Sequence, residues 1–190
     1  RAGTMTLFDK LYNRWLLRKY KVECATPPTI YGRLMIAFFS ATRGRFRIGE
    51  NVVINSSLKS NPVGGCRTIL LIKGDDALIE IGDNTGISNA TLCARQHVSI
   101  GAWVNLGAGC RIFDTDFHSV DFEERIADTN IPSRPVRIED GAFIGAGALV
   151  MKGVTVGERS VVGAQSVVTR DIPPNEIWAG NPAKHIKTLA

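Results

Sequence analysis

The chain has 190 residues, of which 44% are hydrophobic and 22% are charged. This balance is typical of a folded globular domain and excludes a disordered chain. The formal net charge of +5 favours an anionic partner, for which nucleic acid, a membrane surface and a phosphorylated cofactor are the open choices. No apolar run approaches the roughly 18 residues of a transmembrane helix and no secretion signal is recognisable, so a cytoplasmic location is expected.

Residues 1–44 are predicted to form an amphipathic helix and a cap segment. Apolar and basic residues interleave at helical spacing, as in a helix with one apolar and one basic side. The apolar positions are Leu7, Phe8, Leu11, Tyr12, Trp15 and Leu16, and the basic ones are Lys10, Arg14, Arg18 and Lys19. Two roles remain open: packing on the next segment or on another subunit, or peripheral contact with the inner face of a membrane.

From residue 45 to residue 172, aliphatic residues follow a six-residue period. The clearest run is Ile138, Ile144, Val150, Val156, Val162 and Val168, and an earlier run contains Ile81, Ile87, Cys93, Ile100, Leu106 and Ile112. Six residues match neither the 3.6-residue period of a helix nor a plain alternating strand. A short strand followed by a tight corner does match, and three such units make one triangular coil of a parallel β-helix. Within it, Cys93 and Cys110 are expected to be reduced core residues.

The period stops at Phe113 and resumes near Val136, which leaves a polar loop over residues 113–135. In a stack of repeats, such insertions form loops on one face, often the binding face. The loop contains His118, with Asp114 and Asp116 close by in the sequence. Imidazole titrates near neutrality and can take a proton from a hydroxyl group, so His118 is the candidate general base.

Other candidates lie at the corners and near the C-terminus. Asn55, in the INSS segment, can donate a hydrogen bond to an oxyanion, although a corner Asn also bonds to its own backbone. Arg170, and Lys184 and Lys187 in the basic tail 173–190, can hold phosphate groups, although a solvated tail has the same composition. Coenzyme A carries a 3′-phosphate and a pyrophosphate and is a natural partner for these cations.

Several motifs between Arg45 and Lys187 resemble the hexapeptide-repeat acetyltransferases of the maltose, galactoside and nodulation-factor group, most of all the branch acting in capsule or exopolysaccharide synthesis. The motifs are IGENVVINSSLKSNPVGG, IEIGDNTGISNATL, DTDFH, DGAFIGAGALVMKGVTVG, VVGAQSVVTRDIPP and AGNPAKHIK. The resemblance implies an all-β fold with a left-handed parallel β-helix, acetyl-CoA as co-substrate, and a homotrimer with active sites between subunits. Metal-dependent relatives of this fold need a second His five residues from the first, but Phe113 and Glu123 occupy those positions here, so no metal is expected.

The resemblance also implies roles for single residues. His118 falls at the general base and Asn55 at a catalytic Asn on the acceptor side. Asp76 and Asp116 are the candidates for binding the acceptor. The cofactor-binding candidates are Ala146, whose N–H would meet the thioester carbonyl, then Ala164, Thr169 and Arg170 along the pantetheine arm, and Lys184 and Lys187 near the nucleotide, with Phe143 as an aromatic wall.

The implied function is an acetyl-CoA-dependent O-acetyltransferase acting on a hydroxyl of a sugar or surface-polysaccharide precursor. An N-acetyltransferase acting on an amino sugar or antibiotic-type acceptor would use the same base and cofactor. A non-catalytic β-helix scaffold is the alternative of a different class, and it would lack the loop His and the cations. Nucleic-acid binding has no supporting motif beyond the net charge.

Overall fold

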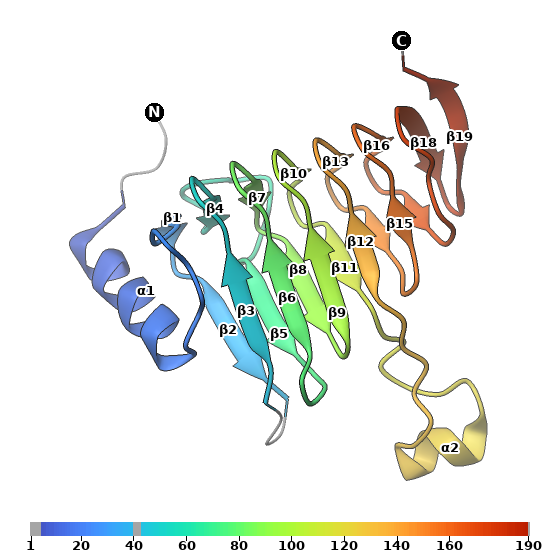
Figure 1. The fold of residues 1–190 in the computed structure, drawn as a ribbon, viewed down its shortest axis with the longest axis horizontal. Helices are drawn as coiled ribbons and strands as arrows, with labels where there is room; N and C mark the ends of the chain where they lie inside the picture. The colour runs from blue at the N-terminus through green and yellow to red at the C-terminus, as the bar shows by residue number, and fades with distance from the viewer. Residues whose placement is uncertain (1–4, 40–42, 190) are drawn as a thin grey trace.

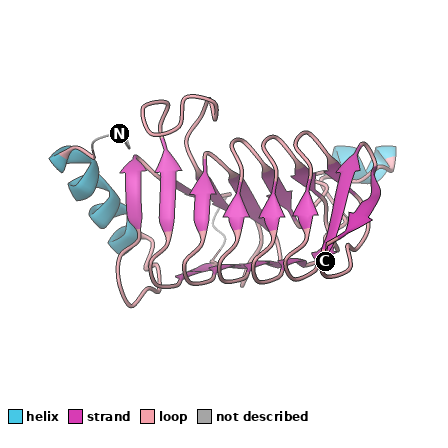
Figure 2. Cartoon of the chain, turned by 90° about the horizontal axis from the view of Figure 1, so that it is seen from above, coloured by secondary structure: helices cyan, strands magenta, loops and turns pink. Residues whose placement is uncertain are grey.

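The computed structural model describes residues 5–39 and 43–189 and shows a prism of stacked coils (Figure 1). Residues 1–4, 40–42 and 190 of the predicted segments lie outside this range. Three β-sheets form the sides of the prism, and in each coil the chain visits them in the same order. Figure 2 shows strands of successive coils side by side along the prism. The all-β class and the parallel β-helix are therefore confirmed.

The three sheets are numbered in the order in which each coil visits them. Sheet 1 contains β1 (Thr29–Gly32), β4 (Val53–Ser56), β7 (Gly86–Ser88), β10 (Asn105–Leu106), β13 (Phe143–Ile144), β16 (Val161–Val162), β18 (Glu176–Gly180) and β19 (Ala183–Thr188). Sheet 2 contains β2 (Met35–Phe38), β5 (Ile69–Ile72), β8 (Thr91–Ala94), β11 (Arg111–Phe113), β14 (Leu149–Val150) and β17 (Val167–Val168). Sheet 3 contains β3 (Arg45–Ile48), β6 (Leu78–Ile81), β9 (His97–Ile100), β12 (Val136–Ile138) and β15 (Thr155–Val156).

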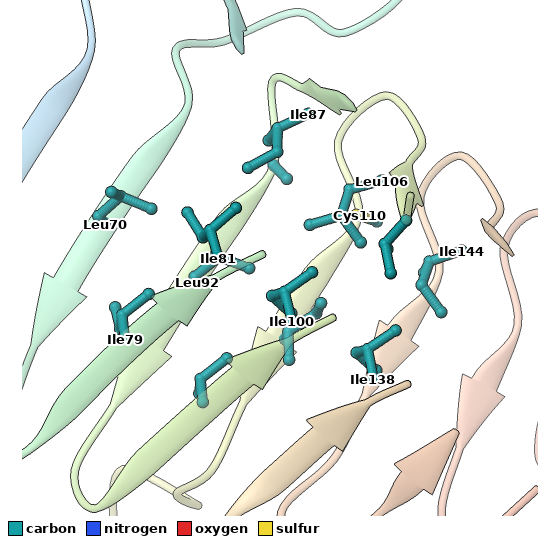
Figure 3. Close-up of a cluster of buried hydrophobic side chains, with 14 of the residues drawn as sticks. Leu70, Ile79, Ile81, Ile87, Leu92, Ile100, Leu106, Cys110, Ile138 and Ile144 are labelled. Atoms are coloured by element: carbon teal, nitrogen blue, oxygen red, sulfur yellow. The ribbon is translucent and has the colours of Figure 1, made fainter. Parts of the chain in front are cut away.

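The core is a set of aliphatic columns that run along the prism. In sheet 3, Ile81 is in register with Ile100, which in turn is in register with Ile138. All three side chains are buried, and Figure 3 shows them pointing into the same interior as the side chains of the other two sheets. The six-residue period therefore has a direct physical cause, because each repeat supplies one inward side chain to the column of its sheet.

Left-handed residues make the tight corners between the sheets. The corner between sheets 1 and 2 has a positive φ at the same place in successive coils, at Asn89 (51°), Gly109 (69°), Gly147 (68°) and Gln165 (58°). Gly147 donates its backbone N–H to the carbonyl of Ala108, and Gln165 donates to Ala146, both at 2.8 Å. The corners are thus stacked by hydrogen bonds in the same way as the strands.

Helix α1 (Leu7–Lys19) packs on the N-terminal end of the prism. The buried amide of Asn13 donates to the carbonyl of Gly32 at 2.8 Å and accepts from the backbone N–H of Leu34 at 3.1 Å. A helix is present where the sequence predicted one, but of the apolar positions named for it only Leu16 is buried, together with Leu17. The other large apolar side chains of the helix, Leu7, Phe8, Leu11 and Trp15, are exposed. Within the described range, no helix is long and apolar enough to cross a bilayer.

The two ends of the coil stack differ from the sequence expectation. The first strands, β1 and β2, precede residue 45 and pair in parallel with β4 and β5. At the other end, the segment expected to be a basic tail contains β18 and β19, which form an antiparallel hairpin that extends sheet 1. The predicted tail is therefore mostly strand.

Among the residues that the structure describes, two segments leave the regular coil. The first is the corner 57–68 between β4 and β5, where the equivalent corner between β7 and β8 contains only Asn89 and Ala90. The second is the excursion 114–135 between β11 and β12, which contains helix α2 (Phe122–Ala127) and leaves from the corner between sheets 2 and 3. The period of the sequence indicated the second departure but not the first.

Asp114 fixes the root of this excursion. Its side chain is fully buried, and its carboxylate accepts hydrogen bonds from the backbone N–H groups of Arg95, Gln96 and His97 at 2.7, 2.7 and 2.8 Å. Burial raises the pKa of the Asp114 carboxyl, and the three donors oppose that rise. The carboxylate thus ties the start of the excursion to the corner of the preceding coil.

Replacing Asp114 is expected to destabilise the fold. Asp114→Ala leaves three partly buried backbone donors without their acceptor, and a donor left unpaired costs about 1–3 kcal/mol when it is fully buried. We expect the free energy of unfolding in urea to fall by about 3 kcal/mol or more. Asp121→Ala is the matched control, because it removes only the exposed N-cap of α2 and should cost about 1 kcal/mol. Equal losses in the two variants would contradict this account of Asp114.

Candidate active site

His118 lies on the excursion with its imidazole exposed to solvent. Its side chain is 65% exposed, and Nδ1 lies 4.0 Å from a carboxylate oxygen of Asp128, the C-cap residue of α2. That distance is too long for a hydrogen bond, but catalytic contacts often tighten when substrate binds. The ring is therefore accessible to a substrate, and a carboxylate that could orient its tautomer lies near it.

The residue before His118 sets the direction of the chain. Phe117 has a φ of 66°, a left-handed conformation that is uncommon for a residue with a large side chain. Its ring packs edge-on against Phe113, with 5.1 Å between the ring centroids. This packing holds the bent backbone in place, so the strain lies directly beside the candidate base, where functional strain is often found.

The residue after His118 is also anchored. The hydroxyl of Ser119, only 5% exposed, donates to Glu124 at 2.6 Å, and the other Glu124 oxygen accepts from the amide of Asn130 at 2.9 Å. Both neighbours of His118 are therefore held by packing or hydrogen bonds while its own side chain stays exposed. This arrangement limits the positions that the imidazole can take.

Lys152 supports the excursion from a later coil. Its Nζ lies 2.7 Å from one carboxylate oxygen of Asp116 and 2.8 Å from the other. Both side chains are about four-fifths buried, so solvent weakens this pair less than an exposed one. Lys152 was not predicted, because its signal in the sequence is only that of a cation in an otherwise apolar repeat. Asp116 is thus engaged in holding the excursion, and its predicted contact with the acceptor stays a prediction.

Asn55 and Phe143 share a different surface. Both line a shallow hollow of about 380 Å³ on sheet 1, together with Ser88 and Asn105. The Asn55 amide donates to the Ser88 hydroxyl at 3.3 Å. Because His118 is on the excursion at the corner between sheets 2 and 3, a single chain does not bring these two candidate catalytic residues into one site.

The cofactor candidates fall into three places. Ala146 and Ala164 are exposed at adjacent corners between sheets 1 and 2. Thr169 and Arg170 are exposed at the opposite edge of sheet 2, after β17. Lys184 and Lys187 are exposed on β19, where they extend sheet 1.

The remaining acceptor candidate, Asp76, is on the same edge as His118. It is exposed at the corner between sheets 2 and 3, with a φ of 58°, and its backbone N–H donates to the carbonyl of Arg43. The excursion leaves this edge two coils later, so Asp76 and the root of the excursion lie along one ridge of the prism.

The two buried cysteines are not nucleophiles of this site. Cys93 and Cys110 are buried, as predicted, and burial raises the pKa of both thiols to about 12. A thiol with that pKa carries almost no thiolate near neutral pH, so neither is a usable nucleophile. In the part of the chain that the structure describes, no three His, Cys, Asp or Glu side chains form a group that could hold a metal ion.

Comparisons with known proteins bear on the fold and the family. The family profile described as "Hexapeptide repeat of succinyl-transferase" matches residues 135–170. The galactoside O-acetyltransferase of Lactococcus lactis is 34% identical over 172 residues, which is 88% of this chain and 72% of that protein. A Schizosaccharomyces pombe protein, described as a candidate acetyltransferase, is 41% identical over 101 residues. That match covers 53% of this chain, which spans about half (48%) of the yeast protein's length.

A solved structure shows the same likeness in three dimensions. The hexapeptide-repeat acetyltransferase of Vibrio cholerae, complexed with acetyl coenzyme A, aligns with a TM-score of 0.55 at 34% identity. The alignment covers 59% of this chain and 61% of that chain. The left-handed parallel β-helix implied by the sequence motifs is thus confirmed. By its repeat, its coiled fold and its similarity to the lactococcal enzyme, the chain belongs to the hexapeptide-repeat acetyltransferase family.

Proposed function

We propose that the protein is an acetyl-CoA-dependent O-acetyltransferase whose acceptor is a hydroxyl of a sugar or surface-polysaccharide precursor in the cytoplasm. The observation that carries this proposal is the exposed imidazole of His118 between two anchored neighbours. Two relatives support it: the lactococcal relative is a galactoside O-acetyltransferase, and the Vibrio relative is solved with acetyl coenzyme A. A scaffold protein would have no use for an exposed, positioned imidazole.

The proposed reaction is direct acetyl transfer. His118 takes the proton of the acceptor hydroxyl, and the oxygen attacks the carbonyl carbon of the acetyl thioester. The backbone N–H of Ala146 stabilises the negative charge on the tetrahedral oxygen. The Asn55 amide, on β4 and three strands away from β13 in sheet 1, contacts the acceptor. When the carbon–sulfur bond breaks, His118 returns the proton to the departing thiolate of coenzyme A. The products are the acetyl ester and free coenzyme A, with no acyl-enzyme intermediate.

The complete site is proposed to form between subunits of a homotrimer. Within one chain, His118 is on the excursion while Asn55 and Ala146 belong to sheet 1 and its edge. A neighbouring copy can place its excursion over that surface and join the two halves. Thr169, Arg170, Lys184 and Lys187 are then proposed to bind the cofactor, and Asp76 and Asp116 the acceptor. Contact of α1 with a membrane is a separate prediction that the activity does not require.

Removing the imidazole is expected to abolish most of the turnover. We expect His118→Ala to lower kcat by about 10²–10⁴-fold, because the acceptor hydroxyl loses its base, while acetyl-CoA still binds. Thiol release from acetyl-CoA over a panel of sugars and amino sugars measures this and identifies the acceptor class. His97→Asn is the matched control, since the His97 imidazole bonds to Glu80 on sheet 3 at 2.6 Å, and the backbone N–H that holds Asp114 is retained in the variant. Full activity in His118→Ala would exclude His118 as the base.

Mixing two inactive variants tests whether the site is shared between subunits. If His118 and Asn55 act from different chains, co-expressing His118→Ala with Asn55→Ala at equal levels restores about a quarter of the sites in a randomly mixed trimer. If each chain contains its own complete site, no mixed assembly is active. The measurement is the specific activity of the mixture relative to each variant alone and to wild type. Activity no higher than that of the single variants would refute the shared site.

The cations of the C-terminal hairpin are expected to act on cofactor affinity alone. Replacing Lys184 and Lys187 with Gln should raise the KM for acetyl-CoA by about tenfold with kcat little changed, because phosphate contacts are made equally in ground and transition states. Arg159→Gln is the control, an exposed cation paired with its neighbour Glu158. An unchanged KM would place the nucleotide elsewhere.

A further inference from the structure

A cavity of about 450 Å³ lies at the N-terminal end of the prism, apart from the residues assigned above. One wall is the start of α1, a second is the end of β1, and the third is the corner 57–68, the teal segment after β4 in Figure 1. The volume is within the usual range for small-molecule sites, about 300–1,000 Å³. The regular coil has no need of this loop, since the same corner one coil later is made by Asn89 and Ala90.

The cavity carries an excess of positive charge. Its charged lining residues are Asp9, Arg33, Lys59 and Arg67. Asp9 and Arg33 form an ion pair at 3.0 Å and so balance each other. Among the described residues, no carboxylate forms an ion pair with Lys59 or Arg67, so the cavity presents about two uncompensated positive charges. A dianion is the matching ligand.

Hydrogen bonds hold the loop that supplies these cations in a defined conformation. The Ser57 hydroxyl accepts a hydrogen bond from the backbone N–H of Ser60 at 3.1 Å. The Ser60 hydroxyl lies within hydrogen-bond distance of two carbonyls, that of Ser57 at 3.0 Å and that of Tyr31 at 3.3 Å. At the other end of the loop, the buried amide of Asn89 donates to the carbonyl of Cys66. These bonds tie the loop to β1 and to the next coil, so the two cations stand on a preformed surface.

The cavity adjoins the acceptor side of the proposed active site. Ser56 lines the cavity, and its neighbour Asn55 lines the hollow on the outer face of sheet 1. A ligand held in the cavity by one end can therefore extend along β4 toward the Asn55 amide. The cavity and the hollow therefore meet at β4, with the cavity on the Ser56 side and the hollow, which Phe143 also lines, on the Asn55 side.

We propose that this cavity binds the phosphate or pyrophosphate group of a phosphorylated acceptor through Lys59 and Arg67, and so selects an activated sugar over a free one. Binding of the anion stands by itself, whereas the selection of the acceptor rests on the proposed acetyl transfer. Arg is suited to bidentate phosphate contact and Lys to a single strong charge, so the pair can share one phosphate group. A carboxylated sugar is the competing source of negative charge.

The thiol of Cys66 offers a direct readout, because it lines the cavity and is exposed. We would measure its alkylation by neutral iodoacetamide, by peptide mass spectrometry, at constant ionic strength without coenzyme A. The probes are inorganic phosphate, pyrophosphate and glucuronate, with half-buried Cys24 as the internal reference. Pyrophosphate should slow Cys66 alkylation with saturation, phosphate should do so more weakly, and glucuronate should have the least effect. No protection by pyrophosphate, or better protection by glucuronate, would overturn the phosphate assignment.

A double variant, called the cavity variant, tests the two cations. In this protein, which carries both Lys59→Gln and Arg67→Gln, the pyrophosphate concentration that gives half-maximal protection of Cys66 should rise by at least about tenfold, since charge-assisted contacts are lost. Both side chains are exposed, so the fold should be retained, and thermal unfolding checks this. The control replaces Lys10 and Arg14 on α1 with Gln, which gives the same change in net charge outside the cavity. Equal protection in the cavity variant and in wild type would refute the role of these cations.

Kinetics separate this inference from the proposed function. Wild type should transfer acetyl to a sugar 1-phosphate with a higher kcat/KM than to the same sugar without phosphate. The cavity variant should lose that preference through KM, whereas His118→Ala lowers kcat for both acceptors. Protection of Cys66 without transfer to any acceptor would support the cavity and sink the transferase. Acetyl transfer without protection of Cys66 and without a preference for the phosphorylated sugar would support the transferase and refute the anion site in the cavity.

Discussion

Stacking of identical coils is the constraint on which the rest of this molecule depends. Each inner strand is fixed in register by ladders to the coils on both sides, and its inward side chains belong to buried columns. A strand of two to four residues therefore leaves few outward positions for chemistry. The chain gains room for function where the coil is interrupted, and the two interruptions, 57–68 and 114–135, each carry polar groups that the core does not need.

The excursion shows how an exposed residue can still be positioned. Its root is held by buried Asp114 and by the ion pair between Asp116 and Lys152, and its outer part by the bonds around Glu124. Because of these contacts, the loop loses its conformational entropy when the protein folds and not when the substrate binds. His118 then reaches its partner groups from a loop that is already shaped. Such preorganisation is what a base acting across a subunit boundary would need.

The sequence predicted the features that recur locally and missed those that link distant coils. The core columns and the position of the excursion follow from a six-residue period that can be read within a short window. The pair of Asp116 and Lys152 joins residues 36 positions apart, and the packing of Phe117 on Phe113 depends on an unusual φ; neither has a local signal. The first coil was also missed: Ile30 and Ile36 are six residues apart, but two positions are too few to establish a period.

The cations behind the net charge of +5 include two groups that lie at opposite ends of the prism. The cations proposed for coenzyme A are on the hairpin at the C-terminal end of the prism, and the two uncompensated cations of the cavity are at the N-terminal end (Figure 1). Two phosphorylated substrates bound at opposite ends would keep their like charges apart while their reactive ends extend toward the middle coils. The excursion leaves the prism from those middle coils, after β11, which is where a base between donor and acceptor has to be supplied.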